Sequence, residues 1–299
     1  MTSLQLLQQS PATFTTSCFV LGLLVGSFLN VVIYRLPFML ERDWRQQCCE
    51  LLKIEDTKLV DQKSPLSWKR LSLAEPASHC PHCHHRIRPC ENIPLISYVL
   101  LAGKCANCRA KISIRYPVIE LATGLLSALI AVNFGVTWLT LALLIFAWAL
   151  IALTMIDFDH QLLPDSITIP LIWLGLAVNT LELGTGITPQ ESILGAIVGY
   201  LSLWSFYWIF KLMTNKEGMG YGDFKLLAAL GAWMGWQALL PIIILSSLVG
   251  AVFGIGCIHL MGRDKSAPLP FGPFLTGAGL IMLIWSSQIY SFYSSEFLL

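Results

Sequence analysis

The sequence predicts an all-α polytopic membrane protein with about eight transmembrane helices and a cytoplasmic zinc-binding loop domain. Three observations lead to this fold class: an apolar composition, long apolar runs and clustered basic residues. Of the 299 residues, 55% are hydrophobic and 12% are charged, whereas a soluble domain usually carries about 25% charged residues. The mean hydropathy is +0.66. This composition argues against a soluble enzyme, a disordered chain and a nucleic-acid-binding protein.

Several apolar runs are long enough to cross a bilayer, which takes about 20 residues in a helix. Their apolarity is continuous rather than alternating, so helices are expected instead of a β-barrel. No charged residue precedes the first run, and Arg35 follows it. A cleavable signal peptide has the opposite charge order, so we expect an uncleaved first span. The seven long runs lie at about 17–34, 117–136, 138–156, 167–184, 191–212, 237–260 and 272–293.

A shorter apolar run at about 223–236 leaves the number of spans open, because it can be re-entrant, lie at the membrane edge or cross. Lys and Arg favour a crossing, since cytoplasmic loops are enriched in both. With eight spans, all connections that hold Lys or Arg fall on one side, namely 35–116, 211–225 and 261–270. We expect that side to be the cytoplasm and both chain ends to face away from it.

Charge also divides the chain into regions. Fourteen of the nineteen Lys and Arg lie within 35–115 together with eight acids, so this stretch carries +6 and the remainder −5. We therefore expect a first transmembrane span at 1–36, a basic cytoplasmic domain at 37–116 and a transmembrane domain at 117–299.

Four of the nine cysteines form two C-x2-C pairs that predict a metal site. The pairs are separated by 21 residues, and two such pairs can complete a tetrahedral site of four thiolates. Disulfides are disfavoured because the cytoplasm is reducing. We expect zinc, with an iron–sulfur centre or no metal as alternatives. Four thiolates leave no position for water, so this zinc is expected to be structural. The predicted ligands are Cys80, Cys83, Cys105 and Cys108.

Ionisable residues at the edges of spans are functional candidates, because charge is costly there. Asp157 and Asp223 fall on the same membrane face in the eight-span topology, and three glycines at alternate positions precede Asp223. Two neighbouring carboxyls can share one proton, so that one activates water and the other donates to a carbonyl, as in aspartyl proteases. A proton-coupled transporter and a purely structural pair are the alternatives. The other candidates are Glu120, Asp159 as a solvated turn residue, and Asp165 as a helix cap.

Several motifs resemble those of the type IV prepilin peptidases, in the same order along the chain. The sequence GYGD at 220–223 resembles the GxGD motif of membrane aspartyl proteases, and DFDHQLLPD at 157–165 resembles its partner segment. The further landmarks are GSFLNVVIYRLP at 26–37, ENIP at 91–94, GKC at 103–105, RYP at 115–117 before Glu120, and PFGP at 270–273. The resemblance covers about residues 17–290.

This resemblance implies a bifunctional enzyme of the bacterial inner membrane, with its active site and zinc loop facing the cytoplasm. It implies that Asp157 and Asp223 cleave the basic leader from type IV prepilins and from type II secretion pseudopilins. The two cysteine pairs are implied to bind the zinc. Prepilins, pseudopilins and membrane lipid are the expected partners, and nucleic acid is not.

The resemblance also implies N-methylation of the new N-terminal residue, usually phenylalanine, with S-adenosylmethionine as the methyl donor. Gly103 and Glu91 are our candidates for binding that cofactor, with a plain turn as the alternative for Gly103. A zinc-containing, proton-coupled transporter and a non-enzymatic assembly platform are the competing functions.

Overall fold

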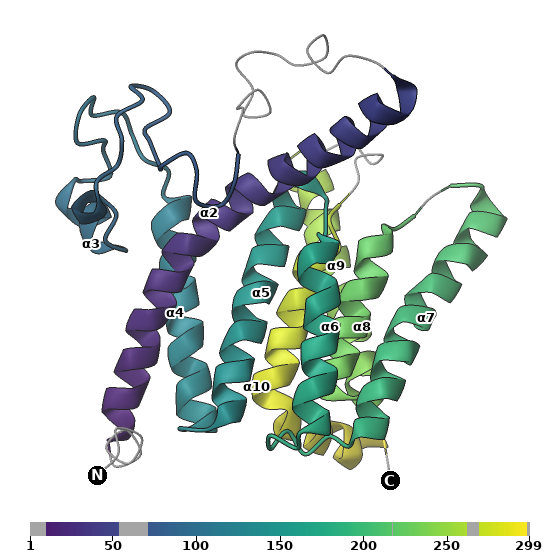
Figure 1. Ribbon diagram of the computed structural model, residues 1–299. Helices are drawn as coiled ribbons and strands as arrows, with labels where there is room; N and C mark the ends of the chain where they lie inside the picture. The colour runs from purple at the N-terminus through teal and green to yellow at the C-terminus, as the bar shows by residue number, and fades with distance from the viewer. Residues whose placement is uncertain (1–9, 54–70, 217, 262–268, 298–299) are drawn as a thin grey trace. The chain divides into compact units, whose positions relative to one another are not determined.

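Helices form the regular structure of this computed structural model, apart from two isolated bridges, in the part that it describes: residues 10–53, 71–216, 218–261 and 269–297. Eight of the described helices exceed ten residues, and each coincides with a predicted apolar run (Figure 1). They are α2 (Pro11–Leu52), α4 (Arg115–Phe134), α5 (Trp138–His160), α6 (Asp165–Thr180), α7 (Pro189–Thr214), α8 (Tyr221–Met234), α9 (Leu239–Met261) and α10 (Gly272–Phe297). The short ones are η3 (Pro89–Glu91), α3 (Ile96–Leu100) and η4 (Trp236–Ala238).

The lengths and compositions of these helices confirm the all-α membrane fold class. Among the described residues, five helices are long and apolar enough to cross a membrane: α2, α4, α5, α7 and the stretch Trp236–His259 of η4 and α9. A shorter apolar stretch, Gly272–Ser286, lies in α10. Helices α6 and α8 have 16 and 14 residues, fewer than the roughly 20 that span a bilayer.

The chain divides into two units, Met1–Gly135 and Val136–Leu299. In the first unit α2 packs along α4, and Gly26 allows their backbones to approach closely. A Cβ atom at Gly26 would lie 2.8 Å from the Cα atom of Glu120. The functional division of the chain at residues 36 and 116 is a separate matter and stays a prediction.

Helix α2 continues beyond its apolar run, through Pro37 to Leu52, and changes direction along its length (Figure 1). Arg35 is buried within it, and its guanidinium donates to the carbonyls of Ser72 at 2.9 Å and Pro76 at 2.6 Å. These bonds compensate for the burial of a charge. They also fix the point at which the chain enters the cysteine region.

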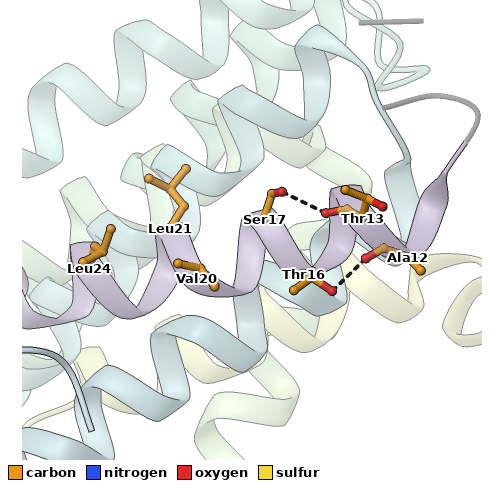
Figure 2. Close-up of a pocket in the computed structure, with 7 residues that line it drawn as sticks. All are labelled: Ala12, Thr13, Thr16, Ser17, Val20, Leu21 and Leu24. Carbon is orange, nitrogen blue, oxygen red and sulfur yellow. Dashed lines mark hydrogen bonds between the residues drawn. The ribbon is translucent and has the colours of Figure 1, made fainter. Parts of the chain in front are cut away.

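Figure 2 shows a shallow apolar groove along the first turns of α2. Its hydroxyl groups bond to their own helix, because Thr16 donates to the Ala12 carbonyl and Ser17 to the Thr13 carbonyl, both at 2.8 Å. The groove holds none of the predicted site residues. It is lined by Ala12, Thr13, Thr16, Ser17, Val20, Leu21 and Leu24.

Helix α8 lies at the centre of the second unit, where α6, α7, α9 and α10 contact it. Every residue of α8 from 226 to 234 is buried. On one side the contact is backbone to backbone, since a Cβ atom on Gly195 of α7 would overlap the Gly231 carbonyl of α8. A Cβ atom on Gly199 would lie 2.7 Å from the Leu227 carbonyl oxygen. Small residues allow such close packing between helices in a membrane.

The C-terminal end of α8 is closed by polar side chains from its neighbours. Asn179 of α6 and Ser192 of α7 both donate to the Ala232 carbonyl, at 2.7 and 2.6 Å. The indole N–H of Trp233 donates to the Leu171 carbonyl at 2.9 Å. The last carbonyls of a helix lack partners within it, so the two bonds to the Ala232 carbonyl help α8 to end inside the protein.

We expect Gly195→Ala to lower the free energy of unfolding by about 1–3 kcal/mol, because the added methyl group overpacks the α7–α8 contact. Thermal unfolding of the purified protein in detergent, followed by tryptophan fluorescence, measures this effect. Gly256→Ala on α9 is the matched control, since its Cβ atom would meet no atom within 4 Å. Equal stability of the two variants would contradict the close approach of α7 and α8.

Candidate active site and candidate metal centre

The two predicted catalytic aspartates lie at helix ends in the second unit. Asp157 is near the C-terminus of α5 and Asp223 is in the first turn of α8. Their exposed fractions are 5% and 7%. The segments that carry them meet at Leu163, which lies against both Gly222, the residue before Asp223, and Gly272, whose N–H donates to Asp157.

Gly272, the first residue of α10, holds one oxygen of Asp157. Its backbone N–H donates to the Oδ2 atom of Asp157 at 2.9 Å. A Cβ atom at Gly272 would lie 2.6 Å from that same oxygen, so only glycine leaves room for this contact. The motif PFGP at 270–273 contains this glycine, but the sequence alone does not indicate its role.

Leu163 fills the space between the two halves of the site. It is buried in the short connection between α5 and α6. A Cβ atom at Gly222 would lie 2.7 Å from the Cβ atom of Leu163, and one at Gly272 would lie 3.3 Å from its Cδ2 atom. The glycine before Asp223 therefore lets α8 approach the segment that follows Asp157.

An ion pair joins the same two segments at the surface. The Nζ atom of Lys225 on α8 lies 2.6 and 2.7 Å from the two carboxylate oxygens of Asp165 on α6. Sequence reasoning missed this pair, since 60 residues separate its members and nothing local indicates the contact. Asp165 is the first residue of α6 rather than its cap, and Asp159 is exposed.

An aromatic cluster flanks the GYGD segment. The buried Tyr207 of α7 contacts the rings of Tyr221 and Phe224, with centroids 5.4 and 5.7 Å apart. The Nζ atom of Lys211 lies 3.1 Å from the Tyr207 hydroxyl and above the Trp208 ring. Sequence reasoning also missed this cluster, because aromatic residues are common in all the spans.

The four predicted metal ligands converge in the first unit. Their Sγ atoms all lie within 4.8 Å of one another, with 3.8 Å between Cys80 and Cys108 and 4.0 Å between Cys83 and Cys105. Four sulfurs placed about 2.3 Å from one tetrahedral ion would be roughly 3.8 Å apart. The geometry of the thiols therefore fits one metal ion.

The two C-x2-C pairs share one backbone pattern. In each, the first cysteine N–H donates to the carbonyl five residues ahead, His85 or Ala110, and its own carbonyl accepts from the residue four ahead, His84 or Arg109. Both of these fourth residues have positive φ angles, 55° and 58°. The bridges His79–Arg86 and Lys104–Lys111 close the two turns. Each pair is thus an independently formed knuckle.

Hydrogen bonds favour the thiolate, the form that binds metal, at two of the four cysteines, Cys83 and Cys105. The Asn107 side chain, assisted by the His85 backbone, lowers the pKa of Cys83 to about 6. The backbones of Cys108 and Asn107 lower the pKa of Cys105. At Cys108 a backbone bond from Ala110 lowers the pKa, but desolvation and the neighbouring thiols raise it overall to about 11.

The two candidates for cofactor binding already have partners within the first unit. The Oε2 atom of Glu91 accepts the Arg88 N–H at 3.0 Å and lies 3.3 Å from the His85 ring. The Arg88 hydrogen bond is the main reason that the pKa of Glu91 is lowered. Gly103 forms a turn at φ +66°, and a Cβ atom there would lie 3.0 Å from the Tyr98 ring. Cofactor binding by Glu91 and Gly103 stays a prediction.

Comparison with known families assigns the two units to two different domains. Residues 20–134 match the family described as "Bacterial Peptidase A24 N-terminal domain". Residues 144–255 match the "Type IV leader peptidase family". The first match holds the cysteine cluster and the second holds both aspartates.

Curated relatives match nearly the whole chain, and several are called prepilin leader peptidase/N-methyltransferase. The relative from Stutzerimonas stutzeri is 51% identical over 98% of both chains. That from Pseudomonas aeruginosa is 51% identical over 96% of this chain and 95% of its own, and that from Neisseria gonorrhoeae is 50% identical over 91% and 90%. No solved structure matches the chain.

We expect the Lys225–Asp165 pair to add about 0.2–1 kcal/mol to the free energy of unfolding, as partly exposed ion pairs do. A double-mutant cycle with Lys225→Ala and Asp165→Ala, measured by thermal unfolding, gives this coupling energy. High salt should weaken it by screening, and the exchanged pair Asp165→Lys with Lys225→Asp should restore part of it. A coupling energy of zero at low salt would show that the two side chains do not interact.

Proposed function

Since the chain belongs to the type IV leader peptidase family, we propose that it cleaves prepilins and pseudopilins with Asp157 and Asp223. The family relation makes it an enzyme of the inner membrane with peptidase and N-methyltransferase activities. The substrates, the residues and the side of the membrane are the proposal. The burial of both carboxyls, on segments that meet at Leu163, carries it.

The proposed cleavage needs no nucleophilic side chain. The pair holds one proton between two carboxyls, as neighbouring carboxyls do. The ionised carboxyl takes a proton from a water molecule, whose oxygen attacks the scissile carbonyl carbon, while the protonated one donates to the carbonyl oxygen. The C–N bond of the tetrahedral intermediate then breaks, as the carboxyl that took a proton from water gives it to the leaving amine. The other carboxyl regains a proton from the hydroxyl group of the intermediate as the new carboxyl group forms.

The location of the pair suits a substrate held at the membrane surface. Both aspartates lie at helix ends next to short connections, where water can reach the peptide bond. The Lys residues of the second unit that the structure describes, Lys211, Lys216 and Lys225, lie in or near these connections, whereas the connections at 181–188 and 235–238 hold no Lys or Arg. The positive-inside rule therefore supports a cytoplasmic active site.

The methyl transfer is assigned to the first unit. S-adenosylmethionine, when bound, supplies a methyl group on a sulfonium sulfur, which an amine nitrogen can attack. Glu91 and Gly103 are joined by one continuous segment that runs between the two knuckles. The residues of this unit would bind and orient the cofactor and the new N-terminus.

Zinc is the metal we propose for the four thiols, with a structural role. All four positions of a tetrahedral ion are taken by Cys80, Cys83, Cys105 and Cys108, so none is left for a reacting water. Helices are sparse between the knuckles, where η3 and α3 together span eight residues. A metal would stabilise this loop more than its small apolar core can.

We expect Asp157→Asn and Asp223→Asn each to reduce leader cleavage by about 10²–10⁴-fold, because each removes one proton-transfer group. Co-expression with a leader-bearing prepilin, followed by the intact mass and N-terminal sequence of the pilin, measures this. Asp159→Asn is the matched control, since Asp159 lies on the same turn but is exposed. Normal cleavage by either of the first two variants would exclude the proposed aspartate pair.

We expect about one zinc ion per chain, and Cys80→Ser should lower that occupancy because it removes one of the four thiolates. Elemental analysis of the purified protein gives the metal identity and stoichiometry. Cys90→Ser is the matched control, since its thiol is exposed and outside the cluster. Iron with acid-labile sulfide, or no metal in protein purified without chelators, would contradict a zinc site.

A further inference from the structure

Glu120 is the buried acid among the described residues of the first unit. It lies in the second turn of α4, within the stretch Arg115–Phe134 that can cross a membrane, and is 8% exposed. Helix α2 covers it, since a Cβ atom at Gly26 would lie 2.8 Å from its Cα atom. A buried carboxylate is unfavourable without a cationic or hydrogen-bonding partner.

The carboxylate of Glu120 is only half satisfied by the described residues. Its Oε2 atom accepts the backbone N–H of Leu95 at 2.9 Å, whereas its Oε1 atom has no donor and the group has no ion pair in that part of the chain. Leu95 has φ +58° and ψ −47°, a conformation that is unfavourable for a branched residue. The bond therefore holds a strained backbone position next to a carboxylate that retains one open oxygen.

A second acceptor lies one helical turn away. Asn30 of α2 is buried, and its amide nitrogen donates to the Tyr116 carbonyl at 3.2 Å. This leaves the Asn30 amide oxygen with no donor among the described residues. Tyr116 lies one turn before Glu120 on α4, and Asn30 lies one turn beyond Gly26 on α2. Since Gly26 faces Glu120 and Asn30 faces Tyr116, Asn30 is about one helical turn from Glu120. Two acceptors and a negative charge are what an ammonium group, with three donors, requires.

We propose that Glu120 binds a primary ammonium group, and this inference rests on the proposed methyl transfer. That reaction brings two such groups to the first unit: the amino-acid end of S-adenosylmethionine and the N-terminus exposed by cleavage. Glu91 differs from Glu120, because it is less buried and the His85 ring already lies 3.3 Å from its Oε2 atom. Leu95, which Glu120 holds, lies between Glu91 and Gly103 on the segment that joins the knuckles.

The variant Glu120→Gln distinguishes an ammonium-binding role of Glu120 from a purely structural one. Glutamine keeps an oxygen for the Leu95 N–H and nearly the same volume, so a purely structural role should survive the change. An ammonium site should not, because the negative charge is lost. Glu50→Gln is the matched control, since Glu50 is an exposed acid at the end of α2 in the same unit.

The test uses the purified full chain in lipid nanodiscs with three measurements: leader cleavage of a prepilin, equilibrium binding of S-adenosylmethionine, and methylation of a peptide that already begins with phenylalanine. For Glu120→Gln we expect unchanged cleavage and a methylation efficiency that is lower by about 30-fold or more. A loss of this size is typical when one partner of a buried charge pair is removed. Glu50→Gln should match the unaltered chain in all three.

The binding data identify the source of the ammonium. If it belongs to the cofactor, Glu120→Gln weakens S-adenosylmethionine but not methylthioadenosine, which lacks the amino-acid end. If it belongs to the peptide, cofactor affinity stays the same and the KM for the peptide rises. Unchanged affinities and methylation would overturn the inference alone, whereas an unaltered chain that cleaves but never methylates would overturn the proposed methyl transfer as well.

A second measurement needs no variant and covers the case in which Glu120→Gln does not insert. Dicyclohexylcarbodiimide modifies carboxyls in apolar surroundings, and peptide mass mapping of the unaltered chain locates the adduct. Saturating S-adenosylmethionine or phenylalanine-initiated peptide should protect Glu120. Labelling of Glu120 to the same extent with and without both ligands would overturn the inference.

Discussion

The brevity of α8 is the constraint on which the second unit depends. Fourteen residues extend over about 21 Å, whereas the apolar core of a bilayer is roughly 30 Å thick. At least one end of α8 must therefore have its polar groups satisfied by protein rather than by water. Asn179 and Ser192 do this at the C-terminal end, and the glycine contacts with α7 enclose the body of the helix. Asp223 is then carried at the other end of a helix whose position is fixed.

The remaining contacts of the site follow from that placement. Leu163 packs against the glycines at 222 and 272, and Gly272 in turn holds Asp157. Three segments far apart in sequence thus meet around two carboxyls. Each contact is made at a glycine, where a Cβ atom would leave too little room. The glycines of GYGD and PFGP are explained by these distances more directly than by flexibility.

Much of the architecture could be predicted from the sequence, because apolar runs and charge asymmetry report membrane helices directly. The spacing of the two cysteine pairs was enough to predict that they form one cluster. The position of Asp157 and Asp223 at the edges of spans was enough to select them as candidates. The Lys225–Asp165 ion pair, the role of Gly272 and the open oxygen of Glu120 could not be predicted, since each is a contact between distant segments. The full length of α2 could not be predicted either, because its second half is rich in charged and polar residues, as a loop would be.

The identical bonding of the two knuckles has a consequence for how metal supply acts on the protein. Each knuckle is a preformed two-sulfur clamp, so an ion that joins them closes the loop between them rather than folding either one. That loop contains Glu91, Leu95 and Gly103, whereas the aspartates belong to the other unit. Under the proposed functions, metal starvation would therefore open the region assigned to methyl transfer and leave the peptidase assembled. Cells short of metal would then produce pilins that are trimmed but unmethylated.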